Sequence, residues 1–392
     1  MKKTLLTICL VWMCFSLSAQ KIIDLSGKWS FSIDRQDNGE KEKWFSHTLN
    51  DCINLPGSMP EKLKGDEVTA KTQWTGSLYD SSYYYNPYME KYRKEGNIKF
   101  PFFLTPDKHY VGAAWYQKEV NIPADWKGER ILLFLERPHI ETTVWVNGQK
   151  TGMQNSLCVP HQYDITHYVR PGKCTITIRV DNRIKEINVG PDSHSITDQT
   201  QGNWNGIVGR ICLQTTPKTY FDDIQIYPEP EQKLARVKVV IKGTGTAKVK
   251  LSAESFNTDK KHIVPAIQQE IKLNKGVTET EMVLPMGNDM LLWDEFHPAL
   301  YKLKAEVTNG KKTEIKEIQF GMRRFEIKGK WFYVNGRKTQ LRGTVENCDF
   351  PLTGYAPMDV ESWERVFRIC RSYGLNHMRF HSFCPPEAAF MA

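Results

Sequence analysis

The sequence predicts a mainly β protein: a jelly-roll sandwich, an immunoglobulin-like sandwich, and then the first strands and helix of a parallel α/β domain. Two observations favour the sandwiches, namely short runs in which apolar and polar residues alternate, and the Asn-Gly or Pro-rich turns between them. A third favours the parallel domain: near the end of the chain apolar residues recur every three or four positions, between two apolar strands. With 40% hydrophobic and 11% aromatic residues, the chain can build well-packed cores.

Residues 1–19 have the pattern of a secretory signal peptide. Lys2 and Lys3 are followed by an uncharged, largely apolar run from Leu5 to Leu17 and by a small-residue cleavage site at Ser18-Ala19. This run is too short for a permanent membrane helix, and no later segment has eighteen continuous apolar residues. The expected location is therefore secreted or periplasmic without a membrane span, with lipid attachment at Cys14 as the alternative.

Residues 20–228 are expected to form the first sandwich. The segment Cys174–Val180 alternates strictly, and Ile140–Val146 does the same before the Asn147-Gly148 turn. About 200 residues of this kind favour a jelly-roll sandwich over a small barrel. Residues 74–108, rich in Tyr, Pro and charge, interrupt the pattern as a long loop insertion. Tyr79, Tyr83–Tyr85 and Tyr88 in this loop are expected either to stack on sugars or to pack on a neighbouring domain.

Residues 229–322 are expected to form the second sandwich. The Pro228-Glu229-Pro230 joint marks its start, and about seven alternating strands follow, which is the size of an immunoglobulin-like domain.

Residues 323–392 are expected to begin a parallel domain. A strand over Gln340–Val345 and a second over Leu375–Phe380 flank a helix that Asp359 can cap and Gly374 can end. The residues expected on the buried face of this helix are Trp363, Val366, Phe367, Cys370 and Tyr373. Because one βαβ unit cannot cover both faces of its own sheet, we expect apolar side chains here, including Trp363 and Phe367, to lie exposed, and deletion after about residue 325 to improve solubility.

Charge and cysteine usage exclude several functions. The net charge of +8 is small for this length, and Lys and Arg alternate with Asp and Glu, which does not favour nucleic acid as a partner. The cysteines are scattered without CxxC pairs, so neither a metal site nor a cofactor is expected.

Seven sequence blocks resemble glycoside hydrolase family two, the family of β-galactosidases, β-glucuronidases and β-mannosidases. In chain order these blocks are Leu25–Trp29 with Leu55–Ser58, Ala114–Lys118, Val144–Gly148, His161–Thr166, Trp204–Arg210, Phe320–Arg323, and Val334–Gly336 with Leu341–Gly343. The resemblance covers nearly the whole chain after the signal. It implies a jelly-roll sugar-binding domain, an immunoglobulin-like domain and the start of a (β/α)8 catalytic barrel.

This resemblance implies the function of a retaining exo-β-glycosidase that acts on oligo- or polysaccharides. Retaining hydrolysis needs two carboxyl groups about 5 Å apart. In the family both are glutamates on later barrel strands, so they are expected beyond Ala392, no catalytic residue is assigned here, and the chain is expected to be inactive alone. A non-catalytic carbohydrate-binding or structural β-sandwich protein is the alternative. Sugar specificity and homo-oligomerisation stay open.

Four residues are candidate substrate contacts by the resemblance: Asp198, Asn347, Arg379 and His381. Arg379 matches a family arginine at the end of the second barrel strand, but the histidine expected three residues later is replaced by Ser382, and His381 comes one place early. Asn347, preceded by Glu346, stands where the family has a histidine. Asp198 lies in the loop from which a family aspartate reaches a sugar hydroxyl. Alternative roles are an ion pair for Arg379, a core position for His381 and a solvated turn for Asp198.

Overall fold

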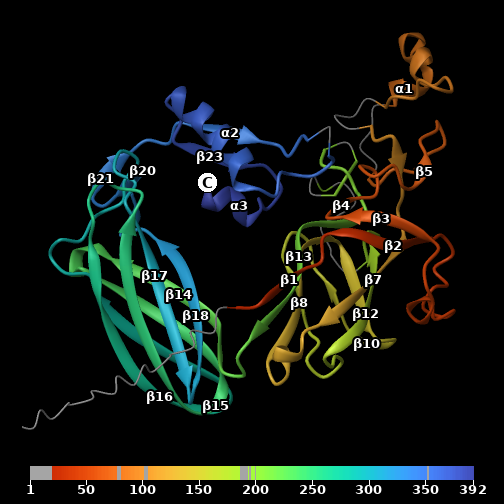
Figure 1. Cartoon of the computed structure of the whole chain (residues 1–392). Helices are drawn as coiled ribbons and strands as arrows, with labels where there is room; N and C mark the ends of the chain where they lie inside the picture. Colours follow the sequence, from red (N-terminus) through yellow and green to blue (C-terminus); the bar gives the residue numbers. More distant parts are fainter. Residues whose placement is uncertain are drawn as a thin grey trace, which may run out of the picture. The chain divides into compact units, whose positions relative to one another are not determined.

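A computed structural model describes residues 20–76, 81–100, 105–185, 193, 196–198, 200–350 and 353–392 (Figure 1). The predicted signal, residues 1–19, lies outside the described residues. The chain divides into two compact units. One unit contains residues 21–216, 327–333 and 337–392, and the other contains residues 217–326 and 334–336.

The first unit contains two antiparallel sheets that match the predicted sandwich. One sheet has the strand order β1-β13-β8-β11, with β4 pairing β13, and the other has the order β10-β9-β12-β7-β2-β3. The strands of the first sheet are β1 (Ile22–Asp24), β4 (Gly57–Ser58), β8 (Arg130–His139), β11 (His161–Asp164) and β13 (Gly206–Thr216). The strands of the second are β2 (Gly27–Asp34), β3 (Asp51–Leu55), β7 (Ala113–Ile122), β9 (Glu141–Val146), β10 (Gln149–Asn155) and β12 (Gly172–Asp181).

The alternation in β12 produces the expected buried face. Cys174, Ile176, Ile178 and Val180 are each at most 1% exposed and belong to the core shared by both sheets. The other face of this sheet is buried as well, because Trp115 and Trp145 pack with Leu49 in a separate cluster that also includes Trp44 and Phe45. The short helix η1 (Trp44–Ser46) carries these two last side chains.

The insertion predicted over residues 74–108 is largely irregular. Its described helices are α1 (Ser82–Tyr85) and η2 (Pro87–Tyr92), and it ends at β6 (Lys108–His109), which pairs with β5 (Asp66–Glu67) from before the insertion. Tyr79 lies outside the described residues. Tyr83 is 1% exposed and stacks on Phe100, with 4.7 Å between ring centroids. Tyr85 and Tyr88, in contrast, are 73% and 85% exposed. Packing therefore accounts for Tyr83 but not for the exposed tyrosines.

The second unit contains one five-stranded antiparallel sheet wrapped around its own core. Its order is β14-β15-β17-β18, with β16 also pairing β15. The strands are β14 (Tyr220–Glu229), β15 (Leu234–Phe256), β16 (Ile263–Pro285), β17 (Leu300–Asn309) and β18 (Lys312–Phe320). Two short helices are η3 (Ala124–Trp126) in the first unit and η4 (Pro230–Gln232) in the second.

Five strands stand where about seven were expected. The reason is that β15 and β16 each continue for 23 residues. The first half of β15 pairs β14 and its second half pairs β17, so one strand takes the place of two. The compact units also divide between Thr216 and Pro217 rather than at Pro228, because Pro228 pairs with Ala235 inside the β14–β15 hairpin.

The last part of the chain contains a parallel strand pair. Three short strands come first, in the order β19-β20-β21: β19 (Phe325–Lys328), β20 (Trp331–Val334) and β21 (Arg337–Thr339). Then β22 (Gly343–Glu346) pairs in parallel with β23 (His377–Phe380), and α2 (Val360–Ser372) connects them. A final short helix is α3 (Glu387–Met391). This is the strand-helix-strand order that the sequence predicts.

The predicted ends of α2 are confirmed. The carboxylate of Asp359 accepts a hydrogen bond from the Ser362 amide at 2.8 Å, and Gly374 follows the helix with a φ of +76°. One face residue was predicted wrongly, since Tyr373 is 81% exposed. It lies at the C-cap, where the helical repeat has ended.

The expectation of exposed side chains here is also wrong for Phe367, which is partly buried, and more clearly for Trp363. Its side chain is 1% exposed, its indole N–H donates to the Pro357 carbonyl at 2.9 Å, and its ring packs with Phe367 and Phe380. The segment 337–392 packs against the first sandwich within one unit. The Arg137 guanidinium, for example, donates to the Cys384 carbonyl at 2.8 Å. Val345, Ile369, Tyr373 and Phe390 are nevertheless half or more exposed.

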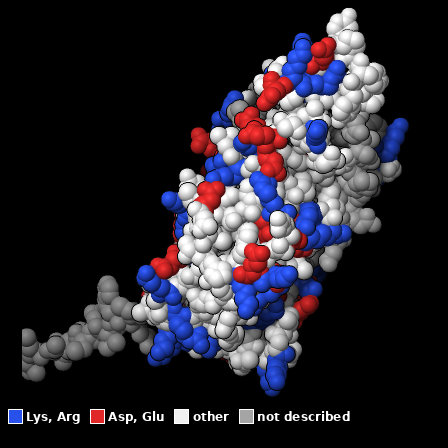
Figure 2. Space-filling model, turned by 90° about the vertical axis from the view of Figure 1, so that its right-hand side faces the viewer, with Lys and Arg blue, Asp and Glu red and all other residues white. Residues whose placement is uncertain are grey.

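The prediction of a mainly β protein built of sandwich sheets is confirmed. Charge of both signs is interspersed on the face that Figure 2 shows, without a large area of one sign. Within the described ranges, no helix has the length and apolar character needed to cross a membrane. The seven cysteines from Cys52 to Cys384 are all free thiols.

Candidate functional site

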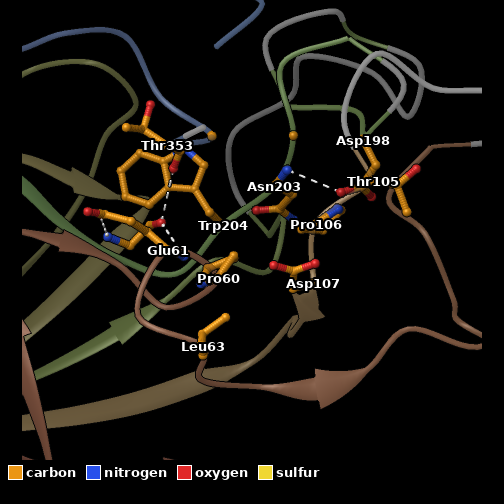
Figure 3. Close-up of a pocket in the computed structure, with 13 residues that line it drawn as sticks. Pro60, Glu61, Leu63, Thr105, Pro106, Asp107, Asp198, Asn203, Trp204 and Thr353 are labelled. Atoms are coloured by element: carbon orange, nitrogen blue, oxygen red, sulfur yellow. Dashed lines mark hydrogen bonds between the residues drawn. The ribbon is translucent and has the colours of Figure 1, made fainter. Parts of the chain in front are cut away.

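A pocket of about 230 Å³ lies in the first unit, and we call it the Asp198 pocket. Four segments that are far apart in the sequence contribute its walls. They supply Ser58, Pro60, Glu61 and Leu63; Thr105, Pro106 and Asp107; Asp198, Gly202, Asn203 and Trp204; and Thr353 and Gly354. Figure 3 shows Asp198 and Thr105 at one end, and Glu61, Trp204 and Thr353 at the other, with Asn203 between them.

Asp198 is a fixed, buried carboxylate, 3% exposed. One of its oxygens accepts the Thr75 amide at 2.5 Å, and the other accepts the Asn203 amide at 3.2 Å. Nε2 of His109 lies 3.5 Å from the second oxygen. A carboxylate offers about four lone-pair sites, so Asp198 keeps acceptor capacity beyond these contacts. The solvated-turn alternative for Asp198 does not fit this burial.

Trp204 is held between two other rings. His139 stacks on it with 4.5 Å between centroids and an interplanar angle of 20°, and Tyr355 lies at 5.6 Å. Burial lowers the pKa of His139 to about 3, while hydrogen bonding to Asn203 acts in the opposite direction. His139 is therefore a neutral ring at physiological pH, and it supports Trp204 without adding charge to the pocket.

Glu61 connects the sandwich to the last segment of the chain. The Tyr355 hydroxyl donates to Glu61 Oε2 at 3.0 Å, and Lys62 Nζ contacts Oε1 at 2.7 Å. Burial, and next the charge of Glu61, raise the pKa of Tyr355 well above its ordinary value. Tyr355 therefore remains a protonated donor. Ser58 Oγ donates to the Thr353 carbonyl at 3.4 Å, which is a second hydrogen bond to the same wall.

The other three predicted site residues lie at the end of the parallel strand pair rather than among the residues lining the Asp198 pocket. Arg379 is on β23 opposite Val345, and its neighbour Phe380 packs on Trp363 of α2. Because successive strand residues point to opposite faces, Arg379 lies on the face away from α2. Both Arg379 and Asn347 are exposed.

His381 is linked to the loop that carries Asp198. The Gln201 side chain donates to the His381 carbonyl at 3.0 Å, and the His381 amide donates to the Glu346 carbonyl at 2.8 Å. Asn347 and His381 are therefore adjacent, each one residue beyond the paired ends Glu346 and Phe380. The four predicted residues thus lie in one region of the first unit. Of the four, only Asp198 lines the pocket.

The Asp198 pocket suits a small polar molecule with hydroxyl groups. The carboxylates of Glu61, Asp107 and Asp198 can accept hydrogen bonds from hydroxyl groups, and charged acceptors form the stronger hydrogen bonds. Trp204, although only 7% exposed, adds apolar surface to the same wall, and sugar C–H groups contact such surfaces. Among the described residues, no three His, Cys, Asp or Glu side chains are grouped so as to hold a metal ion.

Sequence reasoning missed Glu61, Asp107, Asn203 and Thr353 as pocket residues. Trp204 was noted only as part of a sequence block. Asn203 could have been found, since it adjoins that block, whereas Glu61 and Thr353 carry no local signal. They come together only because β4 pairs β13 and the last segment packs beside them.

Two family models match the chain in consecutive order. "Glycosyl hydrolases family 2, sugar binding domain" matches residues 22–217, and "Glycosyl hydrolases family 2" matches residues 219–323. The first match covers the two sheets of the first unit, and the second covers the unit that begins at Pro217.

Curated relatives are β-galactosidases and β-glucuronidases. A β-galactosidase from Thermoanaerobacter pseudethanolicus is 24% identical, with 75% of this chain and 39% of the relative covered. A putative β-glucuronidase from Formosa agariphila is 28% identical, over 70% of this chain and 33% of the relative. The human β-glucuronidase is 23% identical, over 91% and 53%. The chain thus spans between a third and about half of these relatives' lengths.

Solved structures agree on the fold. The crystal structure of Ruminococcus gnavus β-glucuronidase superposes with a TM-score of 0.69 at 18% identity, covering 95% of this chain and 57% of that chain. The same enzyme in complex with D-glucuronic acid gives a TM-score of 0.69 as well.

Proposed function

Because the chain belongs to glycosyl hydrolases family 2, we propose that it is the sugar-binding part of a secreted, retaining exo-β-glycosidase that acts on oligo- or polysaccharides. The observation that carries this proposal is the Asp198 pocket, in which sandwich residues and the segment after β22 line one cavity that contains three carboxylates. The terminal sugar would place its hydroxyl groups against Asp198 and its C–H face near Trp204.

We assign the chemical step to a carboxyl pair that is not among these 392 residues. Retaining hydrolysis needs an acid/base and a nucleophile about 5 Å apart, on opposite sides of the bond to be cleaved. Glu61 is a poor candidate for either role, since Lys62 and Tyr355 already bind its two oxygens. Asp198 likewise accepts two backbone amides.

The parallel pair β22–β23 supports a catalytic barrel as the next domain. Arg379 lies on the strand face opposite α2, which is the face that becomes the interior when such units close into a barrel. Asn347 and His381 follow the carboxyl ends of their strands, where barrel enzymes place their active sites. We propose that all three contact substrate in the complete enzyme.

Sugar binding by the 392-residue chain tests the proposal. We expect D-galactose or D-glucuronic acid, the sugars named by the relatives, to shift NMR signals of residues around the Asp198 pocket. Asp198→Asn should weaken this binding about 10-fold, because a hydrogen bond to a charged acceptor contributes roughly 1.5 kcal/mol. Neither nitrophenyl β-galactoside nor nitrophenyl β-glucuronide should be hydrolysed.

Asp34→Asn is a matched control. Asp34 is equally buried, at 3% exposed, and also accepts two backbone amides, but it does not line the Asp198 pocket. It should affect stability as Asp198→Asn does and leave sugar affinity unchanged. Hydrolysis by this chain, or equal sugar affinity in Asp198→Asn and wild type, would contradict the proposal.

A further inference from the structure

A second and larger hollow borders the Asp198 pocket, and we call it the outer groove. Its volume is about 990 Å³. One wall comes from residues 67–70 and the other from residues 93–100 of the insertion. Small-molecule sites are usually about 300–1,000 Å³, so the Asp198 pocket alone suits a single small unit, whereas the outer groove has room for a longer ligand.

The two hollows share a wall. Thr105, Pro106 and Asp107 line both the Asp198 pocket and the outer groove. The pocket and the groove are therefore adjacent.

A chain of packed rings connects the groove to Asp198. Phe100 of the groove packs edge-on against Trp74 at 4.8 Å, and Trp74 packs on His109 at 4.6 Å. His109 in turn contacts the Asp198 carboxylate. Phe100 is 6% exposed and is held from its other side by Tyr83, so this connection is packed and fixed.

The lining of the outer groove has the mixed chemistry that a sugar chain requires. Val68, Ile98 and Pro106 offer apolar surface, while Thr69, Asn97 and Thr105 offer hydrogen-bonding groups. The lining also contains charged side chains of both signs, which are the cations Arg93 and Lys99 and the anions Glu67, Glu95 and Asp107. Pyranose units have apolar C–H faces and a rim of hydroxyl groups, and such a wall matches both features without demanding a charged ligand.

We propose that the outer groove binds the sugar units that follow the terminal unit in the Asp198 pocket, so that the preferred ligand is a β-linked oligosaccharide rather than a simple glycoside. This inference rests on the proposed function, because the pocket must hold the terminal sugar. It assigns a binding role to the insertion over residues 93–100, which the sandwich itself does not need for its strand pairing.

A length series of ligands tests the groove. Calorimetric titration of the 392-residue chain would use oligosaccharides of one, two and four β-linked units that end in galactose or in glucuronic acid. We expect affinity to rise at least 10-fold from one unit to four in one of the two series. Ala70→Trp places a large ring in the groove from an exposed loop position. It should abolish most of this gain and leave single-unit affinity unchanged.

Ala124→Trp is the matched control, since Ala124 is an exposed alanine of the same unit outside both hollows. It should behave as wild type at every ligand length. Single-unit binding without any gain for longer ligands, or a gain that Ala70→Trp retains, would overturn the groove proposal and leave the proposed function standing. Absence of binding at every length would overturn both. A gain that is lost in Ala70→Trp alone supports the groove.

Discussion

His139 is the buried titratable side chain with the most direct consequence for the pocket. It is 5% exposed and supports Trp204 by stacking. Burial lowers its pKa from 6.5 to about 3. In the unfolded chain the imidazole takes up a proton below about pH 6.5, whereas in the folded chain it does so only near pH 3. The folded state is therefore increasingly disfavoured as the pH falls through this window.

His139→Gln should remove this part of the acid sensitivity. Between about pH 6 and pH 3.5, the wild type should lose up to about 1.4 kcal/mol of unfolding free energy per pH unit more than the variant does. Urea unfolding at a series of pH values measures both slopes, and the difference between them cancels other acid-titrating groups such as Asp181. Equal slopes of unfolding free energy against pH in the two proteins would show that folding does not lower the pKa of His139.

Predictability from the sequence varies among the residues of the site. Asp198 could be named because it stands beside the Trp204 block and matches a family loop. Glu61 and Thr353 could not, because nearly 300 residues separate them and neither lies in a pattern with a chemical meaning. Their contact depends on the packing of the last segment on the sandwich, which strand patterns do not specify.

At the scale of elements, the capping of α2 is the clearest link from sequence to stability. Both carboxylate oxygens of Asp359 bind Ser362, one through the amide and one through the hydroxyl. Asp359→Ala should destabilise the helix by about 1 kcal/mol, because the amide loses its acceptor. Hydrogen exchange over Val360–Ser372 should become faster. Asp359→Asn should retain most of the protection, and equal exchange in all three proteins would exclude a capping role.

Most helices and strands could be predicted because the spacing of their apolar residues shows which face is buried. The alternation of β12 and the helical spacing of α2 both required only local pattern. The two wrong predictions concern the ends of elements, which the spacing of apolar residues does not show. Tyr373 continues the helical spacing although it lies at the C-cap, and the long strand β15 looks like two strands because its partner changes midway.

For the whole molecule, the segment 337–392 has two opposing effects. It exposes apolar side chains such as Ile369 and Phe390, so its removal should improve solubility, as the sequence predicts. It also supplies the partners of Glu61, Ser58 and Arg137 in the sandwich. At about 0.5–1.5 kcal/mol for each hydrogen bond, its removal should cost the sandwich a few kcal/mol.

A chain that ends at Gly336 should therefore be more soluble, unfold several degrees lower and lose sugar binding. Calorimetric scans and sugar titration of the two chain lengths measure these effects. Tyr355→Phe in the full chain removes only one of the hydrogen bonds and should produce a much smaller decrease in the unfolding temperature. An unchanged transition and unchanged sugar affinity after the deletion would show that the segment contributes nothing to the sandwich or to the pocket.

The 23-residue strand β15 restricts where residues can be inserted or deleted as this sequence evolves. Its two halves share one continuous backbone, and adding a single residue between them would turn Val249, Leu251 and Ala253 outward, since side chains alternate from face to face. Opposite Gly243–Gly245 and Leu251–Ala253, the partner strand β16 contains one extra residue each time, and the irregular pairing there absorbs it locally. Descendants of this sequence should therefore gain or lose residues at these two bulges of β16 or in the turn at 257–262, and keep the length of β15 constant.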